Sequence, residues 1–171
     1  MSTDEQQAVP VFDVAADRAA VRAVVDAFLD AFRSGPESPQ RLDRLRELLL
    51  PQAIIVRTCG LDLGVYDVDS FIAPRAALLA GGSLVDFHEW STGGRIDVFG
   101  DIAAWFGAYA KEGVHDGEPT TGRGMKSVQL VRTPQGWRIS AVAWDDERPG
   151  LDGPPAGPDP EVDTAGAPGP G

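Results

Sequence analysis

Residues 122–147 read GRGMKSVQLVRTPQGWRISAVAWDDE, and this stretch is the most informative part of the chain. It contains two runs of strand-forming residues, 123–132 and 137–146, which are joined by a turn at Pro134 and Gly136. Strands that are joined by so short a connection pair with each other in the antiparallel direction. The stretch therefore predicts a β-hairpin that closes the folded part of the chain.

Two more strands are predicted before this hairpin, over residues 84–98 and 102–111, because both segments have the period of two that strands show. A long loop is expected over residues 112–122. The adjacent residues Gly93 and Gly94 interrupt the longest strand, and glycines inside a strand are typical of a bulge. The sequence thus predicts an antiparallel meander that bends at this glycine pair.

The first half of the chain has the periodicity of helices. Apolar residues recur at three- and four-residue steps over 17–33, and again from Ser38 to a stop at Pro51. A third helix is predicted over 68–80, after a short strand at 53–59. Helices followed by an antiparallel meander predict an α+β fold with about three helices gathered on one face of the sheet.

The closing pattern of RGMKSVQL at 123–130, GWRI at 136–139 and Trp144 resembles the nuclear transport factor 2-like superfamily, in its SnoaL-like branch. That resemblance implies a cystatin-like roll, in which a cone-shaped, curved antiparallel sheet is packed by the N-terminal helices. It also implies an apolar pocket at the open end of the cone and a homodimer formed through the outer sheet face. Members include ketosteroid isomerases, dehydratases, polyketide cyclases and transport adaptors, so the resemblance is specific for the fold and not for one activity.

The composition favours one soluble domain with loose ends. Residues 13–147 are expected to form the domain, and residues 1–12 a flexible N-terminus. Residues 148–171 are rich in proline, glycine and acids and have almost nothing to bury, so they are predicted to be a disordered tail.

The 171-residue chain carries a formal net charge of −11. This charge repels phosphate backbones and anionic lipids, so neither nucleic acid nor a membrane is expected as a partner. Cys59 is the only cysteine, which excludes an intrachain disulfide and two-cysteine metal motifs. The N-terminus does not have the pattern of a signal peptide, and no apolar run approaches the roughly 20 residues of a membrane span. A cytoplasmic protein is therefore expected.

His88 and Asp86 are the candidate catalytic residues. They share one face of the predicted strand, where the carboxylate can orient an imidazole that titrates near neutral pH. The alternative is a hydrogen-bonded histidine on a sheet face without a catalytic role. Glu89 follows His88 directly, but neighbours on a strand point to opposite faces and cannot chelate one ion. No metal and no cofactor is expected.

The candidate ligand-pocket residues are aromatic, basic or hydrogen-bonding side chains of the predicted strands and of the segment before the third helix. Aromatic walls with a few polar groups are typical of small-molecule pockets. The basic residues can bind a carboxylate or an enolate, or can instead pair with acids of the protein. The candidates are Arg57, Tyr66, Trp90, Trp105, Tyr109, Lys126, Ser127, Gln129, Trp144 and Asp145.

Three functions remain open from the sequence. The first is binding of a small hydrophobic or aromatic metabolite in the cone pocket. The second is a cofactor-independent cyclase, dehydratase or isomerase that works through Asp86 and His88. The third is a subunit without catalytic activity that dimerises or holds a partner through the outer sheet face. Motifs for nucleotide binding, hydride transfer or a nucleophile elbow are absent from the sequence.

Overall fold

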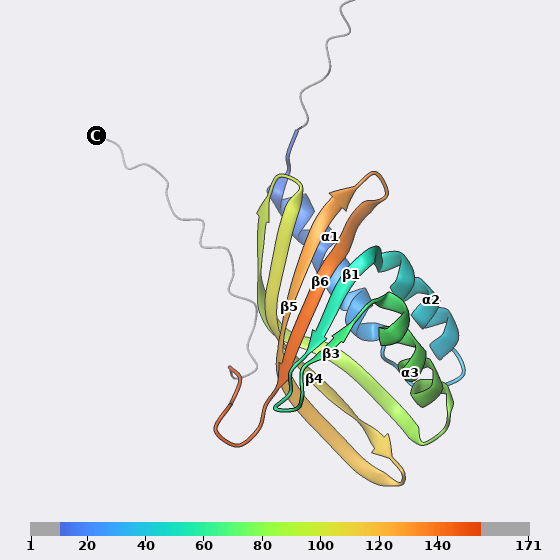
Figure 1. The fold of residues 1–171 in the computed structure, drawn as a ribbon. Helices are drawn as coiled ribbons and strands as arrows, with labels where there is room; N and C mark the ends of the chain where they lie inside the picture. The colour runs from blue at the N-terminus through green and yellow to red at the C-terminus, as the bar shows by residue number, and fades with distance from the viewer. Residues whose placement is uncertain (1–10, 155–171) are drawn as a thin grey trace, which may run out of the picture.

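The computed structural model describes residues 11–154. The outer parts of the predicted flexible ends, residues 1–10 and 155–171, lie outside the described residues. Three helices and six strands follow one another along the chain (Figure 1): α1 (Val14–Asp30), α2 (Ser38–Leu48), β1 (Leu49–Arg57), β2 (Gly64–Tyr66), α3 (Val68–Ala80), β3 (Leu84–Phe99), β4 (Ile102–His115), β5 (Glu118–Thr133) and β6 (Gly136–Asp146).

The six strands form one sheet in the order β2-β1-β6-β5-β4-β3. The strands from β3 to β6 are an antiparallel meander, as the sequence predicted, and β1 pairs with β6 in the parallel direction. These two strands are far apart in the sequence, so no hairpin turn forces them to be antiparallel. The α+β prediction is confirmed, with a mixed sheet instead of a purely antiparallel one.

The sheet curves around α1, with the helices on its concave side (Figure 1). The predicted bulge at the glycine pair is present, since the register of β3 against β4 shifts between Ser91 and Gly93. Gly93 has a φ of 141°, which favours glycine. The fully buried Trp105 fills the bend, because a Cβ on Gly94 or Gly107 would lie within 3 Å of its indole. The glycines thus let a large ring pack against bare backbone.

Helices α1 and α3 begin at capping side chains, whereas no side chain caps the start of α2. Asp13 accepts a hydrogen bond from the backbone N–H of Ala16 at the start of α1, and Asp67 and Ser70 form a capping box at the start of α3. The apolar stripe of α1, including Val21 and Val25, is fully buried against the sheet. Burial of each such side chain contributes roughly 1.5–3 kcal/mol. This packing fixes α1 across the hollow of the sheet.

The connection between β4 and β5 differs from the prediction of a long loop. Both strands continue to a two-residue turn at Asp116 and Gly117, whose φ angles are 50° and 84°. Asp-Gly is a preferred sequence for such a turn, because both positions need positive φ. The predicted loop over 112–122 is therefore a long hairpin arm.

The segment that follows β6 has a defined path over residues 148–154. Arg148 and Leu151 form a backbone bridge, and the Arg123 guanidinium donates a hydrogen bond to the carbonyl of Pro154 at 3.1 Å. Arg148 also forms an ion pair with Asp145. The first residues of the predicted tail therefore fold back along the outer face of the sheet.

Candidate functional site

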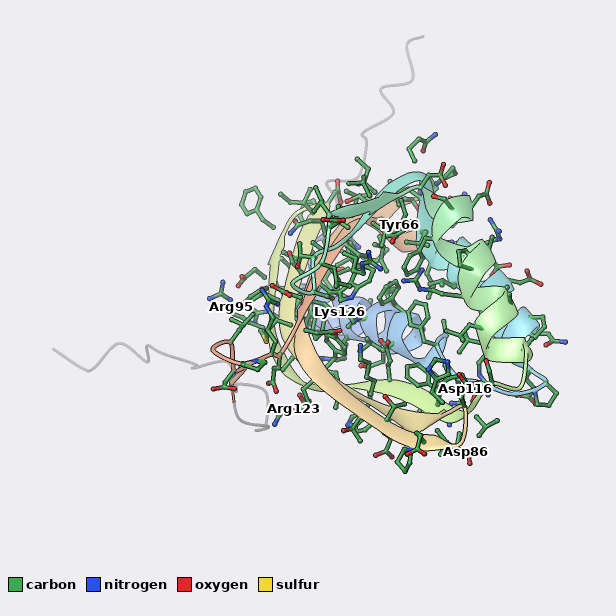
Figure 2. The ribbon with its side chains drawn as sticks, turned by 60° about the horizontal axis from the view of Figure 1, so that its bottom comes forward. Tyr66, Asp86, Arg95, Asp116, Arg123 and Lys126 are labelled. Carbon is green, nitrogen blue, oxygen red and sulfur yellow. The ribbon has the colours of Figure 1, made fainter. Side chains whose placement is uncertain are left out.

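A cavity of about 360 Å³ lies inside the cone, between the concave face of the sheet and the helices. We call it the cone pocket. Figure 2 shows Lys126 inside this hollow, whereas Arg95 and Arg123 point away from it. The side chains that line the pocket are Phe28, Phe32, Arg57, Cys59, Leu61, Phe71, Arg75, Leu78, Leu79, Leu84, Phe87, Glu89, Lys111, His115, Thr120, Lys126, Trp144 and Asp146.

Aromatic rings from α1, from the turn after it, from α3 and from β6 form one wall of the cone pocket. The ring of Phe71 packs edge-on against Phe32 and Trp144, at centroid distances of 5.8 and 5.9 Å. Phe28 continues this row next to Phe32, at 5.3 Å. Edge-to-face contacts of this kind stabilise aromatic clusters beyond their buried area. The wall is thus a packed apolar surface.

Lys126 and Glu89 form a buried ion pair in the pocket. The Lys126 Nζ lies 3.3 Å from Glu89 Oε2, and the two side chains are 5% and 12% exposed. The ammonium also lies 3.8 Å from the ring centroid of Tyr109 and 5.1 Å from that of Trp144. Burial lowers the pKa of Lys126, against the opposing attraction of Glu89.

Asp146 holds a second group of polar side chains together. The Tyr109 hydroxyl donates a hydrogen bond to it, and Lys111 donates another at 3.0 Å. Burial disfavours the charge on Asp146, but these two hydrogen bonds outweigh burial and the pKa of Asp146 is lowered. Burial and the hydrogen bond to Asp146 raise the pKa of Tyr109. Burial likewise raises the pKa of the Cys59 thiol nearby. Asp146 is therefore a stable anion and a weak base.

Two arginines reach the pocket without a carboxylate partner among residues 11–154. The Arg75 guanidinium stacks 3.7 Å over the Phe71 ring and donates to the Phe71 carbonyl at 2.8 Å. Burial lowers the pKa of Arg75, and the charge of Arg57 acts in the same direction. The Arg57 Nε is buried and has no hydrogen-bond partner in the described part of the chain.

Some of the predicted pocket residues lie in or around the cone pocket. Arg57, Lys126 and Trp144 line it. Tyr109 lies behind Lys126, and Tyr66 packs at the edge of the pocket, 6.1 Å from the Phe71 ring centroid. Trp105 is on the same concave side, but it is fully buried at the bend of the sheet and lines no part of the pocket.

Three other predicted pocket residues lie on the outer face of the sheet. Ser127 and Asp145 line a second cavity of about 360 Å³, which we call the outer groove and which also contains Phe106, Met125 and Leu151. Gln129 is exposed on the same face of β5. Trp144 and Asp146 of β6 point into the cone pocket. Asp145 lies between them and points outward, because side chains alternate along a strand.

Asp86, His88 and Trp90 also do not line the cone pocket. The register of β3 against β4 shifts between Val85 and His88, and Asp86 has a φ of 53°, so the strand contains a second bulge that reverses the alternation of its faces. His88 stacks on Trp90 at 4.7 Å and lies 3.7 Å from the Glu112 carboxylate. The predicted Asp86–His88 pair therefore has no place in the wall of the cone pocket.

Seven polar residues of the pocket were not predicted from the sequence. Phe87 and Glu89 occupy the inward positions of β3 because of the bulge at Asp86, which parity alone does not reveal. Arg75 comes from the predicted third helix, whose buried face was not assigned. These polar residues are Cys59, Arg75, Glu89, Lys111, His115, Thr120 and Asp146. One signal was available, because Lys111 and Lys126 are the only lysines in the chain.

Neither a metal cluster nor a membrane-spanning helix is found among residues 11–154. No group of three or more His, Cys, Asp or Glu side chains in this range is arranged to hold a metal ion. None of the helices in the same range combines the length and the hydrophobicity that a bilayer span requires.

No protein-family model and no curated protein sequence matches the chain. Solved structures do match. A nuclear transport factor 2-like superfamily protein from Salmonella enterica has a TM-score of 0.65 at 14% identity, over 80% of this chain and 94% of that one. A protein with a cystatin-like fold from Novosphingobium aromaticivorans has a TM-score of 0.59 at 18% identity, over 84% and 87% of the two chains.

An enzyme structure is similar to the chain to the same degree. The hexachlorocyclohexane dehydrochlorinase of Novosphingobium barchaimii has a TM-score of 0.64 at 16% identity, over 79% of this chain and 89% of that one. Identities this low relate folds and not activities. The predicted SnoaL-like branch stays a prediction. The element order, the curved sheet around a cone pocket and these matches together show that the chain has the nuclear transport factor 2-like, cystatin-like α+β fold.

Proposed function

We propose that the protein binds a small, largely aromatic metabolite with one carboxylate in the cone pocket. The observation that carries this proposal is the pair of arginines, Arg57 and Arg75, which face an aromatic cavity without a carboxylate partner among the described residues. The volume of about 360 Å³ suits a ligand of one or two rings. Such a ligand fits a small-molecule-binding member of the SnoaL-like branch.

The charge of the pocket supports an anionic ligand. Lys126 pairs with Glu89, and Lys111 pairs with Asp146 at 3.0 Å, so these four charges offset one another. Arg57 and Arg75 remain and leave the pocket positive inside a chain of net charge −11. Cations that converge in a cleft with low-dielectric walls attract anions to that cleft.

The unsatisfied Arg57 Nε supports a carboxylate in particular. A buried N–H without a partner costs roughly 1–3 kcal/mol, because it has lost its hydrogen bonds to water. A planar carboxylate can accept two parallel hydrogen bonds from a guanidinium, which is the geometry that arginine recognises best. The aromatic wall around Phe71 and Trp144 then packs against the ring of the ligand.

This proposal predicts a difference in affinity between 2-naphthoate and 2-naphthamide, which have nearly the same shape but differ in charge. Binding to the wild-type protein is measured by titration calorimetry. We expect the carboxylate to bind at least tenfold more tightly, because only it pairs with the two arginines. Equal affinities, or tighter binding of the amide, would contradict an anionic ligand.

We propose in addition that the outer face of the sheet forms a homodimer. Phe106 is 59% exposed and Ile102 is 58% exposed, and both lie on this face of β4, four residues apart. Large exposed apolar side chains that gather on one face are typical of a protein interface. This contact leaves the cone pocket of each copy open, because the pocket lies on the opposite side of the sheet.

The dimer proposal predicts that Phe106→Asp separates the two copies. A buried charge without a partner disfavours an interface strongly. Light scattering after size-exclusion chromatography should give twice the chain mass of 18.1 kDa for the wild type and 18.1 kDa for the variant. Val65→Asp is the control, since Val65 is 62% exposed on the edge strand β2. A monomeric wild type, or a dimeric Phe106→Asp variant, would refute the interface.

A further inference from the structure

The distribution of lysine and arginine in this chain is uneven. The chain has 15 basic residues, of which only Lys111 and Lys126 are lysines, and both of these line the cone pocket. Arginine stays protonated in proteins, whereas lysine can lose its proton when it is buried and can then act as a nucleophile. The pocket is therefore the only part of the described chain that contains a side-chain amine.

We propose that Lys126 is a nucleophile that forms an imine with an aldehyde or ketone bound in the cone pocket. The proposed ligand is an aromatic carboxylic acid. The imine requires that this acid also carries an aldehyde or ketone group, which makes it an aromatic oxo acid. This deepens the proposed function and rests on it only for the carboxylate. The amine chemistry rests on Lys126 and its neighbours.

The surroundings of Lys126 favour the uncharged, nucleophilic form of its amine. The side chain is 5% exposed and lies between the rings of Tyr109 and Trp144. Burial lowers the pKa of Lys126, and the charge of Lys111 acts in the same direction, whereas Glu89 and Asp146 oppose both. A lysine that is desolvated beside another cation is an activated nucleophile. Lys126 therefore holds a larger neutral fraction at neutral pH than a lysine in water.

Lys111 is the less suitable of the two amines. Its side chain is 27% exposed, and its Nζ donates a hydrogen bond to Asp146 at 3.0 Å. This bond and the Tyr109 hydroxyl hold Asp146 as an anion, so the Lys111 amine is engaged by a charged acceptor and is not free to attack a carbonyl. The polar contact of Lys126 is longer, because its Nζ lies 3.3 Å from the Glu89 carboxylate.

Glu89 is placed to carry the protons of the reaction. It takes one proton from the Lys126 ammonium, and the freed Nζ electron pair forms a C–N bond to the carbonyl carbon while the C=O π pair moves to oxygen. A proton then moves from nitrogen to that oxygen. Glu89 returns its proton to the new hydroxyl, which leaves as water as the nitrogen pair forms the C=N bond. One ammonium and one carbonyl give one protonated imine and one water, so no other reactant is consumed.

The arginines define the ligand that can reach this amine. Arg57 and Arg75 line the same pocket as Lys126, and a carboxylate bound to them leaves the rest of the ligand against Trp144 and Phe71. An aromatic compound with both a carboxylate and a carbonyl group satisfies these contacts. A neutral aldehyde of equal size lacks the charged contact and should react more slowly.

Reductive trapping tests the proposal on the wild-type protein. The full chain is incubated with 4-carboxybenzaldehyde and sodium cyanoborohydride, which reduces an imine to a stable secondary amine. Intact mass and peptide mapping then locate the adduct among two lysines and the N-terminal amine. We expect Lys126 to react at least tenfold faster than Lys111. Equal labelling of all three amines, or a Lys126 without label, would overturn the proposal.

Two variants serve as controls. Lys126→Arg keeps the positive charge but removes the nucleophile, so its pocket adduct should disappear. Arg95→Lys adds a third lysine to the chain, on the outer face at a side chain that is 73% exposed, and this amine reports the trapping rate of an ordinary lysine in the same protein. Lys126 should react at least tenfold faster than the introduced lysine in that variant at pH 7. A faster exposed lysine would show that the pocket does not activate Lys126.

The pH dependence separates a role of Glu89 in proton transfer from a structural one. The trapping rate should rise with pH as Lys126 loses its proton, and its midpoint should lie below that of the exposed lysine, because burial lowers the pKa of Lys126. Glu89→Gln removes the anion that holds the proton, so the midpoint moves to lower pH. The same variant loses the proton carrier, so the plateau rate falls at least tenfold. If Glu89→Gln changed neither the pH midpoint nor the plateau rate, Glu89 would be excluded from the reaction.

The two proposals fail separately. If 2-naphthoate binds but no adduct forms on Lys126, the imine is refuted and carboxylate binding stands. If the adduct forms on Lys126 but 2-naphthoate and 2-naphthamide bind equally, the amine chemistry stands and the preference for an anion is refuted. If neither occurs, both proposals are wrong.

Discussion

Gly107→Ala is expected to destabilise the protein by about 3 kcal/mol or more, at the upper end of the cost of overpacking a core. A Cβ at this position would lie 2.1 Å from Cζ2 of Trp105 and 2.6 Å from the carbonyl oxygen of Gly93. Neither neighbour can move freely, because the indole is fully buried and the carbonyl belongs to the bent strand. Since whole domains are stable by only about 5–15 kcal/mol, the loss is large.

Urea denaturation followed by tryptophan fluorescence measures this effect. Gly122→Ala is a matched control on β5, because its Cβ would meet only the flexible side chain of Lys111. We expect the control to lose less than about 1 kcal/mol, in the range of ordinary surface changes. If Gly107→Ala were as stable as the control, the packing of Trp105 against bare backbone at the bend would be wrong.

Arg57→Met is expected to weaken the binding of 2-naphthoate by about 10- to 100-fold, since a hydrogen bond to a charged group contributes roughly 1.5–3 kcal/mol. The affinity for 2-naphthamide should change little. The variant should keep or gain stability, because it removes a half-buried cation whose buried Nε has no partner among the described residues. A gain in stability with a loss of binding is typical of a functional residue and not of a structural one.

Calorimetric titration and thermal unfolding of the same samples measure both effects. Arg95→Met is the matched control, because Arg95 is an exposed arginine on the outer face that pairs with Asp97. It should bind 2-naphthoate as the wild type does. Unchanged affinity in Arg57→Met would remove Arg57 from the site, and a large loss of stability would mean that its role is structural.

The fold could be predicted from the sequence because its signals are local. The helix that follows Asp67 begins at its cap, and the hairpin around Pro134 and Gly136 follows from turn chemistry. The Asp116–Gly117 turn shows the limit of this approach, since its two-residue signal lay inside a segment that looked like a loop. The parallel pairing of β1 with β6 depends on contacts between distant segments, which local patterns do not contain.

The candidate site was harder to predict, because it depends on which face of each strand points inward. Alternation assigns faces only as long as a strand is regular, and one extra residue exchanges them. Because of the bulge at Asp86, Glu89 and not His88 points into the cone pocket. The inward residue of β6 is Asp146 and not Asp145, which the sequence alone did not reveal. Lys126 was identified, because it lies in a regular part of β5.

A titration of ¹⁵N-labelled protein with 2-naphthoate, followed by NMR, shows where this ligand binds. We propose that the hollow of the curved sheet binds this aromatic anion. We predict that the largest shifts occur at the Arg57 Nε–H and the Trp144 indole N–H, which line the cone pocket. Shifts confined to Phe106, Met125 and Leu151 would place the ligand in the outer groove and contradict the claim, as would a spectrum that does not change.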